Sequence, residues 1–526
     1  MSLDRPLIVV SGALLQCFLA AAQHPPAEIQ AEIVPLFHSA RQAEQRRDFS
    51  QAARLYDQIL TLDPKLAEVW TNLGLVLHEL DRHREALAAF ARAASLKPDL
   101  ITPQLFLAIE YVRLAEPQKA VAPLEAVLAR EPANKQALYA LAEANAHLER
   151  FRLAVNLYHE LIQRDPGMEQ ASYRLGITYL NWSKVTARKL IDVLPRSGWG
   201  DLLLADFEAV VGFSEDAERN YRAAVAALPR AVEPRIAFGR FYLESNPPAA
   251  EEQFARAGEL APAAFRDLLA QAGRALVKRD VVEARMLAAA AWNAVRHQHV
   301  SEALPELERQ ARQDPQALYQ LSLTLSELAR QTFEEAVRRN PNSYRAHMLL
   351  ADLAKATRDA GKARAEYARA MEVAPEDPDV RVTYIQFLAG EHDDAATLEA
   401  AREAAGKFPA HPAVNTELGK ILLRSNQAQE AALRFERALK ADATLAAARA
   451  GLADCYAAMG ELEKAAMEMQ RALPSDIDGS LHYRLGRWYQ KLGREREAAE
   501  AYSQTARLKD EKRKSELMRF TLTLEK

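Results

Sequence analysis

The sequence contains very little cysteine. Its 526 residues include only Cys17 and Cys455, which are too few for a disulfide framework, so stability must come from packing. Glycine is also scarce for a β-rich protein of this length, with 19 residues, whereas alanine, leucine, glutamate and arginine dominate. Because these four residue types favour helices, the composition predicts an all-α fold.

The sequence also lacks the usual marks of nucleic-acid binding and of catalysis. Lys and Arg total 68 against 72 acidic residues, and no strong basic block appears. Phosphate-binding surfaces concentrate positive charge, so we expect no nucleic-acid partner. A glycine-rich phosphate loop, a G-x-S-x-G elbow and a kinase signature are all missing. We therefore expect a protein that is not an enzyme and has no cofactor.

The stretch HELDRH resembles a zinc-protease helix at first sight. His78 and His83 are five residues apart, whereas the H-E-x-x-H motif needs two histidines at i and i+4 on one helical face. Residues 80–82 have the character of a turn between two helices. The two histidines are therefore predicted to belong to different helices, without a metal site.

Two other polar clusters have simple structural explanations. His297 and His299 are two residues apart, which directs them differently on a helix, so no metal site is expected there. Asp393 and Asp394 follow a predicted turn, where a solvated helix cap is expected rather than an acid–base pair.

Residues 1–22 have the pattern of a secretory signal. An apolar run extends from Leu7 to Ala22, and the small residues Ala20–Ala22 precede Gln23. The run is too short and too weakly flanked to be a comfortable membrane span. We expect export to the periplasm or medium if it is cleaved, with no membrane span in the mature chain. A packed first helix in a cytoplasmic protein and an uncleaved anchor are the alternatives.

Proline recurs every 34 residues in two series. Each proline follows a helical apolar pattern and ends one helix before the next begins. The two series are Pro64, Pro98, Pro132 and Pro166, then Pro341, Pro375 and Pro409. Such a constant spacing indicates an array of similar units.

One unit, residues 67–100, shows the internal pattern best. Two apolar stripes with i, i+3, i+4, i+7 spacing flank the turn, which predicts a helical hairpin. Gly74 and Ala86 are small where the helices should cross, and Trp70 and Phe90 fill the space around them. The predicted packing positions are Trp70, Leu73, Gly74, Ala86, Phe90, Ala93 and Pro98.

This pattern resembles the tetratricopeptide repeat family, with Leu77 in place of the usual tyrosine, and the frame recurs over most of residues 33–512. The resemblance implies a right-handed α-solenoid of stacked antiparallel helix pairs, with about 13–14 units of which the central ones are degenerate. It also implies a concave wall that binds proteins or peptides. The lysine–asparagine–arginine clamp of chaperone-binding members is not found here.

The middle of the chain departs from the pattern. Residues 173–195 and 319–341 lack the turn, and each is either one long helix or a decayed repeat. The two segments match each other without gaps, Tyr173 against Tyr319 and Pro195 against Pro341, which indicates a duplicated block. The expected organisation is a signal at 1–22, an N-terminal array at 33–168, a degenerate block at 169–299, its second copy at 300–411, and a C-terminal array with an end helix at 412–526.

The function that best fits is a non-catalytic scaffold or adaptor in an exported envelope assembly. A cytoplasmic repeat protein that binds peptides is the alternative, and an enzyme with a novel site near residues 173–345 is the third. The last would require strongly perturbed titrating groups clustered in a pocket there. Candidate binding positions on the concave face are Thr71, Asn72, Leu75, Tyr139, Glu143, Tyr483, Arg484 and Arg487.

Overall fold

The computed structural model describes residues 27–193, 197–211, 213–300, 304–356 and 359–516. In this part of the chain every regular element is a helix, which confirms the all-α prediction. The predicted signal, residues 1–22, lies outside the described residues. Among the described helices, none is both long enough and apolar enough to cross a membrane.

The chain divides into two compact units, each assembled from separate segments. The first unit takes its described residues from Met1–Ala171, Asn340–Ser475 and Arg484–Ala499. The second takes them from Ser172–Arg339, Asp476–Tyr483 and Glu500–Lys526. Helices α10, α27 and α28 each contribute to both.

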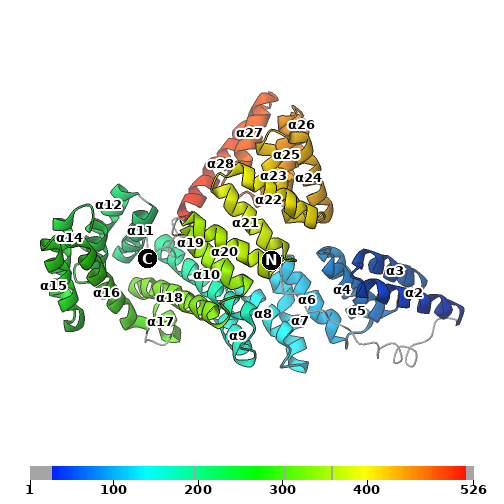
Figure 1. Ribbon diagram of the computed structural model, residues 1–526, viewed down its shortest axis with the longest axis horizontal. Coiled ribbons are helices and arrows are strands. Elements are labelled where there is room, and N and C mark those ends of the chain that lie inside the picture. Colours follow the sequence, from blue (N-terminus) through cyan, green and yellow to red (C-terminus); the bar gives the residue numbers. More distant parts are fainter. Residues whose placement is uncertain (1–26, 194–196, 212, 301–303, 357–358, 517–526) are drawn as a thin grey trace. The chain divides into compact units, whose positions relative to one another are not determined.

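Regular hairpins of two short helices make up both ends of the chain, as the spacing of the prolines predicts (Figure 1). The N-terminal hairpins are α2 (Ala27–Gln45) with α3 (Phe49–Leu62), α4 (Ala67–Glu79) with α5 (His83–Leu96), α6 (Ile101–Arg113) with α7 (Pro117–Arg130), and α8 (Lys135–His147) with α9 (Phe151–Arg164). The later hairpins are α19 (Tyr344–Ala356) with α20 (Ala360–Val373), α21 (Pro378–Gly390) with α22 (Asp394–Lys407), α23 (Pro412–Arg424) with α24 (Ala428–Ala441), α25 (Ala446–Ala458) with α26 (Leu462–Ala472), and α27 (Ser480–Lys491) with α28 (Glu495–Glu516).

The middle of the chain has less regular helix lengths. In order, the helices here are α10 (Glu169–Val193), α11 (Gly198–Val211), α12 (Ser214–Ala227), α13 (Glu233–Tyr242), α14 (Pro247–Leu260), α15 (Ala263–Val277), α16 (Val281–Val300), α17 (Leu304–Gln310) and α18 (Pro315–Arg339). Helices α10 and α18 begin and end at corresponding residues of the two matching segments, and so do α12 and α20.

A single residue with left-handed backbone reverses the chain in every regular hairpin whose turn lies wholly within the described residues, which leaves out α19–α20. Asp81 has φ of +57°, and the N–H of Arg82 then donates to the carbonyl of Leu77 at 2.9 Å, closing the end of α4. Residues other than glycine rarely adopt this backbone conformation, because their Cβ atom comes too close to the carbonyl oxygen. Among the described residues, the other non-glycine positions of this kind are Arg47, Ala115, Glu149, His392 and Asn426 in regular hairpins and Arg279 between α15 and α16.

In several hairpins the two helices meet where a glycine faces an aromatic ring. A Cβ on Gly74 would lie 2.6 Å from Cε1 of Phe90, so only glycine allows α4 and α5 to approach this closely. The same contact joins Gly239 to Phe254 and Gly419 to Phe435.

The other predicted packing positions surround this contact. Leu73, Ala86 and Ala93 are buried. Trp70 is partly buried, and its indole N–H donates to the carbonyl of Pro64 at 3.0 Å. Pro98 is exposed, between α5 and α6.

The central helices α10 and α18 are each 25 residues long, so the prediction of one continuous helix is confirmed for both. They pack against each other (Figure 1). A Cβ on Gly176 would lie 2.5 Å from Cε1 of Phe333. Phe333 precedes Pro341 by eight residues, as Phe90 precedes Pro98, so it is the aromatic residue of its own repeat. Helix α18 therefore packs on α10 where a regular helix would meet its own hairpin partner.

The α10–α18 pair, which we call the exchanged pair, is antiparallel. The hydroxyl of Ser183 donates to the carbonyl of Ser322 at 2.7 Å and lies 2.9 Å from the hydroxyl of Ser326. Moving forward along α10 from Gly176 to Ser183 thus means moving backward along α18. Because the two helices are also equivalent in sequence, they are related by local pseudo-twofold symmetry.

Candidate functional site

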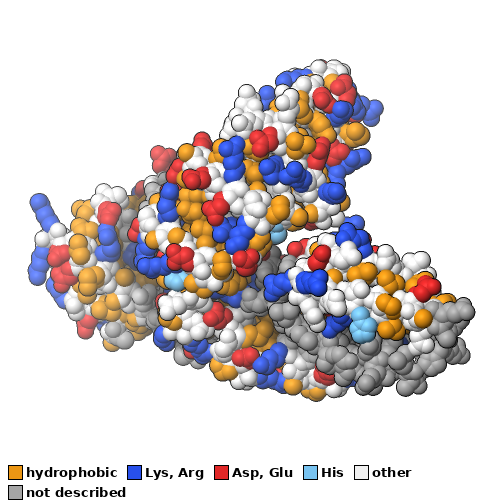
Figure 2. Space-filling view, turned by 45° about the vertical axis from the view of Figure 1, so that its right-hand side comes forward, with side chains coloured by type: hydrophobic (Ala, Val, Ile, Leu, Met, Phe, Trp, Pro, Cys, Tyr) orange, Lys and Arg blue, Asp and Glu red, His pale blue; other side chains and the backbone are white. Residues whose placement is uncertain are grey.

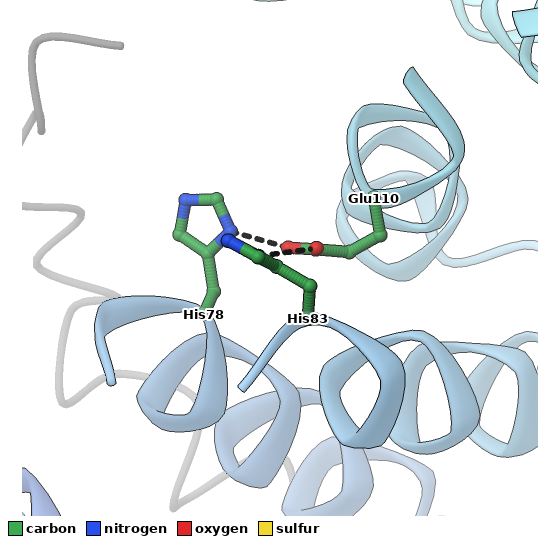
Figure 3. A group of neighbouring side chains, drawn as sticks. All are labelled: His78, His83 and Glu110. Carbon is green, nitrogen blue, oxygen red and sulfur yellow. Dashed lines mark hydrogen bonds and ion pairs between the residues drawn. The ribbon is translucent and has the colours of Figure 1, made fainter. Parts of the chain in front are cut away.

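Three side chains that can ligate metals converge at the turn between α4 and α5 (Figure 3). His78 lies in the last turn of α4, His83 is the first residue of α5, and Glu110 extends from α6 of the next hairpin. The Nδ1 atom of His83 lies 2.9 Å from Oε2 of Glu110, and Nδ1 of His78 is hydrogen-bonded to Oε1 of the same carboxylate. We call these three residues the His–Glu–His cluster.

The carboxylate of Glu110 is completely buried, whereas the side chains of His78 and His83 remain 12% and 25% exposed. Burial by itself would raise the pKa of Glu110, but the hydrogen bonds and positive charge from the two histidines outweigh it and hold that pKa below its usual value. The buried group is therefore ionised, and two imidazoles satisfy it.

An aromatic wall fixes the ring of His78. Phe106 meets this ring edge-on, with centroids 5.4 Å apart, and stacks on Phe90 at 5.5 Å. Because Phe90 also fills the crossing at Gly74, the cluster is positioned by the central contact of the hairpin.

The sequence correctly placed His78 and His83 in different helices, on either side of a turn, but it missed that both reach Glu110. One signal was available. Glu110 occupies the repeat position that Val76 holds in the preceding unit and Ala144 in the following one, and both of these are buried apolar residues. An acidic residue at an apolar position of the repeat predicts a buried partner.

Pairs of tyrosine and acid replace the glycine–phenylalanine contact in several hairpins. The hydroxyl of Tyr221 donates to Asp206 at 2.7 Å, and that of Tyr367 donates to Asp352 at 2.9 Å. Tyr158 likewise donates to Glu143. In each pair the acid lies on the first helix of the hairpin and the tyrosine on the second. Glu143, predicted to face a ligand, thus holds two helices together.

The predicted binding positions in the N-terminal array have little exposed surface. Thr71, Asn72, Tyr139 and Glu143 are each less than a tenth exposed, and Leu75 is partly buried. The hydroxyl of Thr71 donates to the carbonyl of Ala67 at 2.8 Å, within its own helix.

The predicted binding positions on α27 are more accessible. Tyr483 is 45% exposed, and Arg487 is exposed one turn further along the helix. Arg484 is partly exposed and forms an ion pair with Asp454 of α25. Burial raises the pKa of Asp454 to about 6, although the guanidinium of Arg484 favours the charged form.

The remaining candidates behave as structural groups where they are described. Asp393 caps α22, accepting from the N–H of Ala396 at 3.1 Å, and this bond and Arg364 lower its pKa. The cap predicted at this turn is therefore confirmed. The side chains of His297 and His299 fall outside those described.

In residues 173–345, where an enzyme site would need clustered and perturbed titrating groups, burial raises the pKa of two tyrosines. It raises the pKa of Tyr179 to about 12. Burial also raises the pKa of Tyr221, and the neighbouring charge of Asp206 adds to this effect. Both effects are expected of tyrosines packed between helices. On the face shown in Figure 2, acidic and basic side chains are interspersed over the described elements.

The comparisons with known proteins identify the repeat. A sequence model described as tetratricopeptide repeat matches residues 39–101 and 107–169, and a second model of that description matches 327–382 and 422–480. No curated protein matches the chain significantly.

Solved structures with similar folds include yeast Tom70, which is 13% identical, with a TM-score of 0.35, over 92% of this chain and 94% of that one. PilF of Pseudomonas aeruginosa is 19% identical, with a TM-score of 0.31, over 41% of this chain and 92% of that one. MamA of Desulfovibrio magneticus RS-1 is 20% identical, with a TM-score of 0.28, over 32% of this chain and 95% of that one. Likeness at this level says nothing about function. The constant proline spacing, the helix hairpins and the matching repeat models make this chain a member of the tetratricopeptide repeat family.

Proposed function

We propose that the protein is a non-catalytic scaffold that binds segments of partner proteins on the surface of its helix hairpins. Tetratricopeptide repeat proteins are protein-interaction scaffolds that bind proteins or peptides. The observation that supports a particular surface is the exposed aromatic group at the C-terminal hairpin. Tyrosine, when exposed, supplies a large contact area at a low cost in side-chain entropy.

Tyr483, Tyr502 and Lys509 form this surface, which we call the α27–α28 patch. The rings of Tyr483 and Tyr502 have centroids 5.9 Å apart, and Nζ of Lys509 lies 5.5 Å from the ring centroid of Tyr483. Two rings beside a cation suit a segment with an apolar side chain next to a carboxylate.

The test is site-specific photo-crosslinking of the full chain in its own host. A photoreactive residue at Tyr483 is expected to capture a defined partner, whereas the same residue at Leu433, which is 57% exposed on α24, is not. Tyr483→Ala should weaken binding of that partner at least about tenfold, which corresponds to about 1.4 kcal/mol. Equal capture from both positions, or none from either, would contradict the proposal.

We also propose that the scaffold works outside the cytoplasm, in an envelope assembly. The support is the apolar segment Leu7–Ala22 with its small residues before Gln23. Sequencing the N-terminus of the protein isolated from its host is expected to begin at Gln23. Retention of Met1–Ala22 in a cytoplasmic fraction would favour a cytoplasmic peptide-binding protein instead.

A further inference from the structure

We propose that His78, His83 and Glu110 form a binding site for a zinc-class transition metal ion. One ligand atom from each of the three side chains lies within 4.8 Å of the other two. The ligands come from α4, α5 and α6, so the ion would join two successive hairpins. The proposal is independent of the α27–α28 patch.

The donor set selects the class of metal. Two imidazole nitrogens and one carboxylate oxygen are the ligands of many zinc sites, in which water takes the fourth position. Mg²⁺ and Ca²⁺ prefer oxygen ligands throughout and are disfavoured by two imidazoles. The partial exposure of both histidine side chains leaves a route for the ion and for a water ligand.

Only a small movement separates the present geometry from a metal site. Bonds of 2.0–2.1 Å to a tetrahedral ion place neighbouring ligand atoms about 3.3 Å apart. The Nδ1 atom of His83 now lies 2.9 Å from Oε2 of Glu110, which is a hydrogen-bond distance. Binding requires this pair of atoms to separate by a few tenths of an ångström and each coordinating nitrogen to release its proton.

The surroundings oppose a larger rearrangement. Phe106 packs against the ring of His78, and Glu110 is buried in the middle of a well-formed helix. The turn that separates the histidines is closed by the backbone hydrogen bond from Arg82 to Leu77. The three ligands are therefore held near one another before an ion binds, which lowers the entropic cost of binding.

Isothermal titration of the metal-stripped full chain, made without a polyhistidine tag, tests the site with ZnCl₂. The expected result is one tight equivalent of Zn²⁺ per chain. The variant His83→Gln keeps a hydrogen-bond donor for Glu110. It should lower the affinity for that one Zn²⁺ ion at least about tenfold. His78→Gln should act in the same way.

His347→Gln is the matched control, because His347 is also hydrogen-bonded to a buried glutamate, Glu366, at 2.7 Å but is not part of a three-ligand group among the described residues. This variant should still bind one Zn²⁺ per chain with the affinity of the wild type. Co²⁺ absorption of a four-coordinate ion and slower hydrogen exchange in α4–α6 on zinc binding provide independent readouts. A folded chain that binds no Zn²⁺, or one that binds it equally after His83→Gln, would overturn the proposal.

Discussion

The α4–α5 hairpin and the exchanged pair use the same contact with different connectivity. In the hairpin, Gly74 receives Phe90 from the very next helix, across a left-handed turn. In the exchanged pair, Gly176 receives Phe333, which lies far along the chain in the matching segment 319–341. The contact between glycine and ring is thus the same in both regions, but the helix that supplies the ring differs.

The loss of the turn accounts for this difference. The stretch from Gly176 to Pro195 is five residues shorter than the stretch from Gly74 to Pro98, so the long helix lacks the residues of a hairpin turn. Without these residues the chain cannot reverse, and the second half of α10 continues away from the first. In the antiparallel pair, α18 supplies the ring that α10 lacks, because the residue of α10 equivalent to Phe333 is Ala187.

The largest expected effect is on the regular hairpin. Phe90→Ala should destabilise it by about 3–5 kcal/mol, because Phe90 is fully buried against Gly74. Units of a repeat array contact mainly their neighbours, so the loss should remain local. Hydrogen exchange should accelerate in α3–α6 and remain unchanged in α10 and α18. Acceleration in the exchanged pair would contradict this contrast.

The second effect is a pH dependence of stability that is expected in the regular array but not in the exchanged pair. Asp454, in the regular C-terminal array, has a pKa of about 6 when folded and about 3.8 when unfolded. The folded state binds its proton more tightly, so the contribution of Asp454 to stability falls as pH rises from about 4 to 6, by about 3 kcal/mol at most.

Asp454→Asn removes this dependence, and denaturation at pH 4.5 and pH 7 compares the two proteins. The variant should gain stability relative to the wild type as pH rises. The exchanged pair, joined by the neutral hydroxyls of Ser183 and Ser326, should show no such change in hydrogen exchange. An identical pH profile in wild type and variant would refute the role given to Asp454.

The third effect is that a substitution in α18 should loosen α10, although the two helices lie far apart in the sequence. Phe333→Ala should cost about 2 kcal/mol, less than Phe90→Ala because Phe333 is only partly buried. Hydrogen exchange should accelerate in α10 as well as in α18. Changes confined to α18 and its sequence neighbours would show that the exchanged contact does not form.

The smallest effect has opposite signs in the two regions. Ala115→Gly should stabilise the α6–α7 turn by up to about 1 kcal/mol, because Ala115 has φ of +59°. Asn181→Gly, at an exposed position in the middle of α10, should destabilise that helix by about 0.3 kcal/mol, because asparagine is itself a weak helix former. Thermal or urea denaturation of each variant measures both. Equal signs would imply that α10 has a turn-like bend there.

The regular units could be predicted from the sequence because their determinants are local. The apolar spacing, the small residue at Gly74 and the ring at Phe90 all lie within one repeat unit, and the missing turn in α10 and α18 was equally visible. The pairing of α10 with α18 was not, because no local pattern specifies a contact between residues so far apart in the chain.

The candidate site was harder to predict for a related reason. Thr71 and Asn72 were placed on an open face by helical geometry alone, which does not show how closely the next hairpin covers them. The cluster needed Glu110 from that next hairpin, so HELDRH by itself could give only the turn.

The exchanged pair also has a consequence for protein synthesis. When the ribosome has completed α10, the groove at Gly176 has no ring to fill it until Phe333 has emerged. At the usual elongation rates this interval is roughly 10 s, far longer than the time in which a hairpin closes. The nascent chain therefore presents one uncovered apolar stripe during that time, which is a place for a chaperone to act.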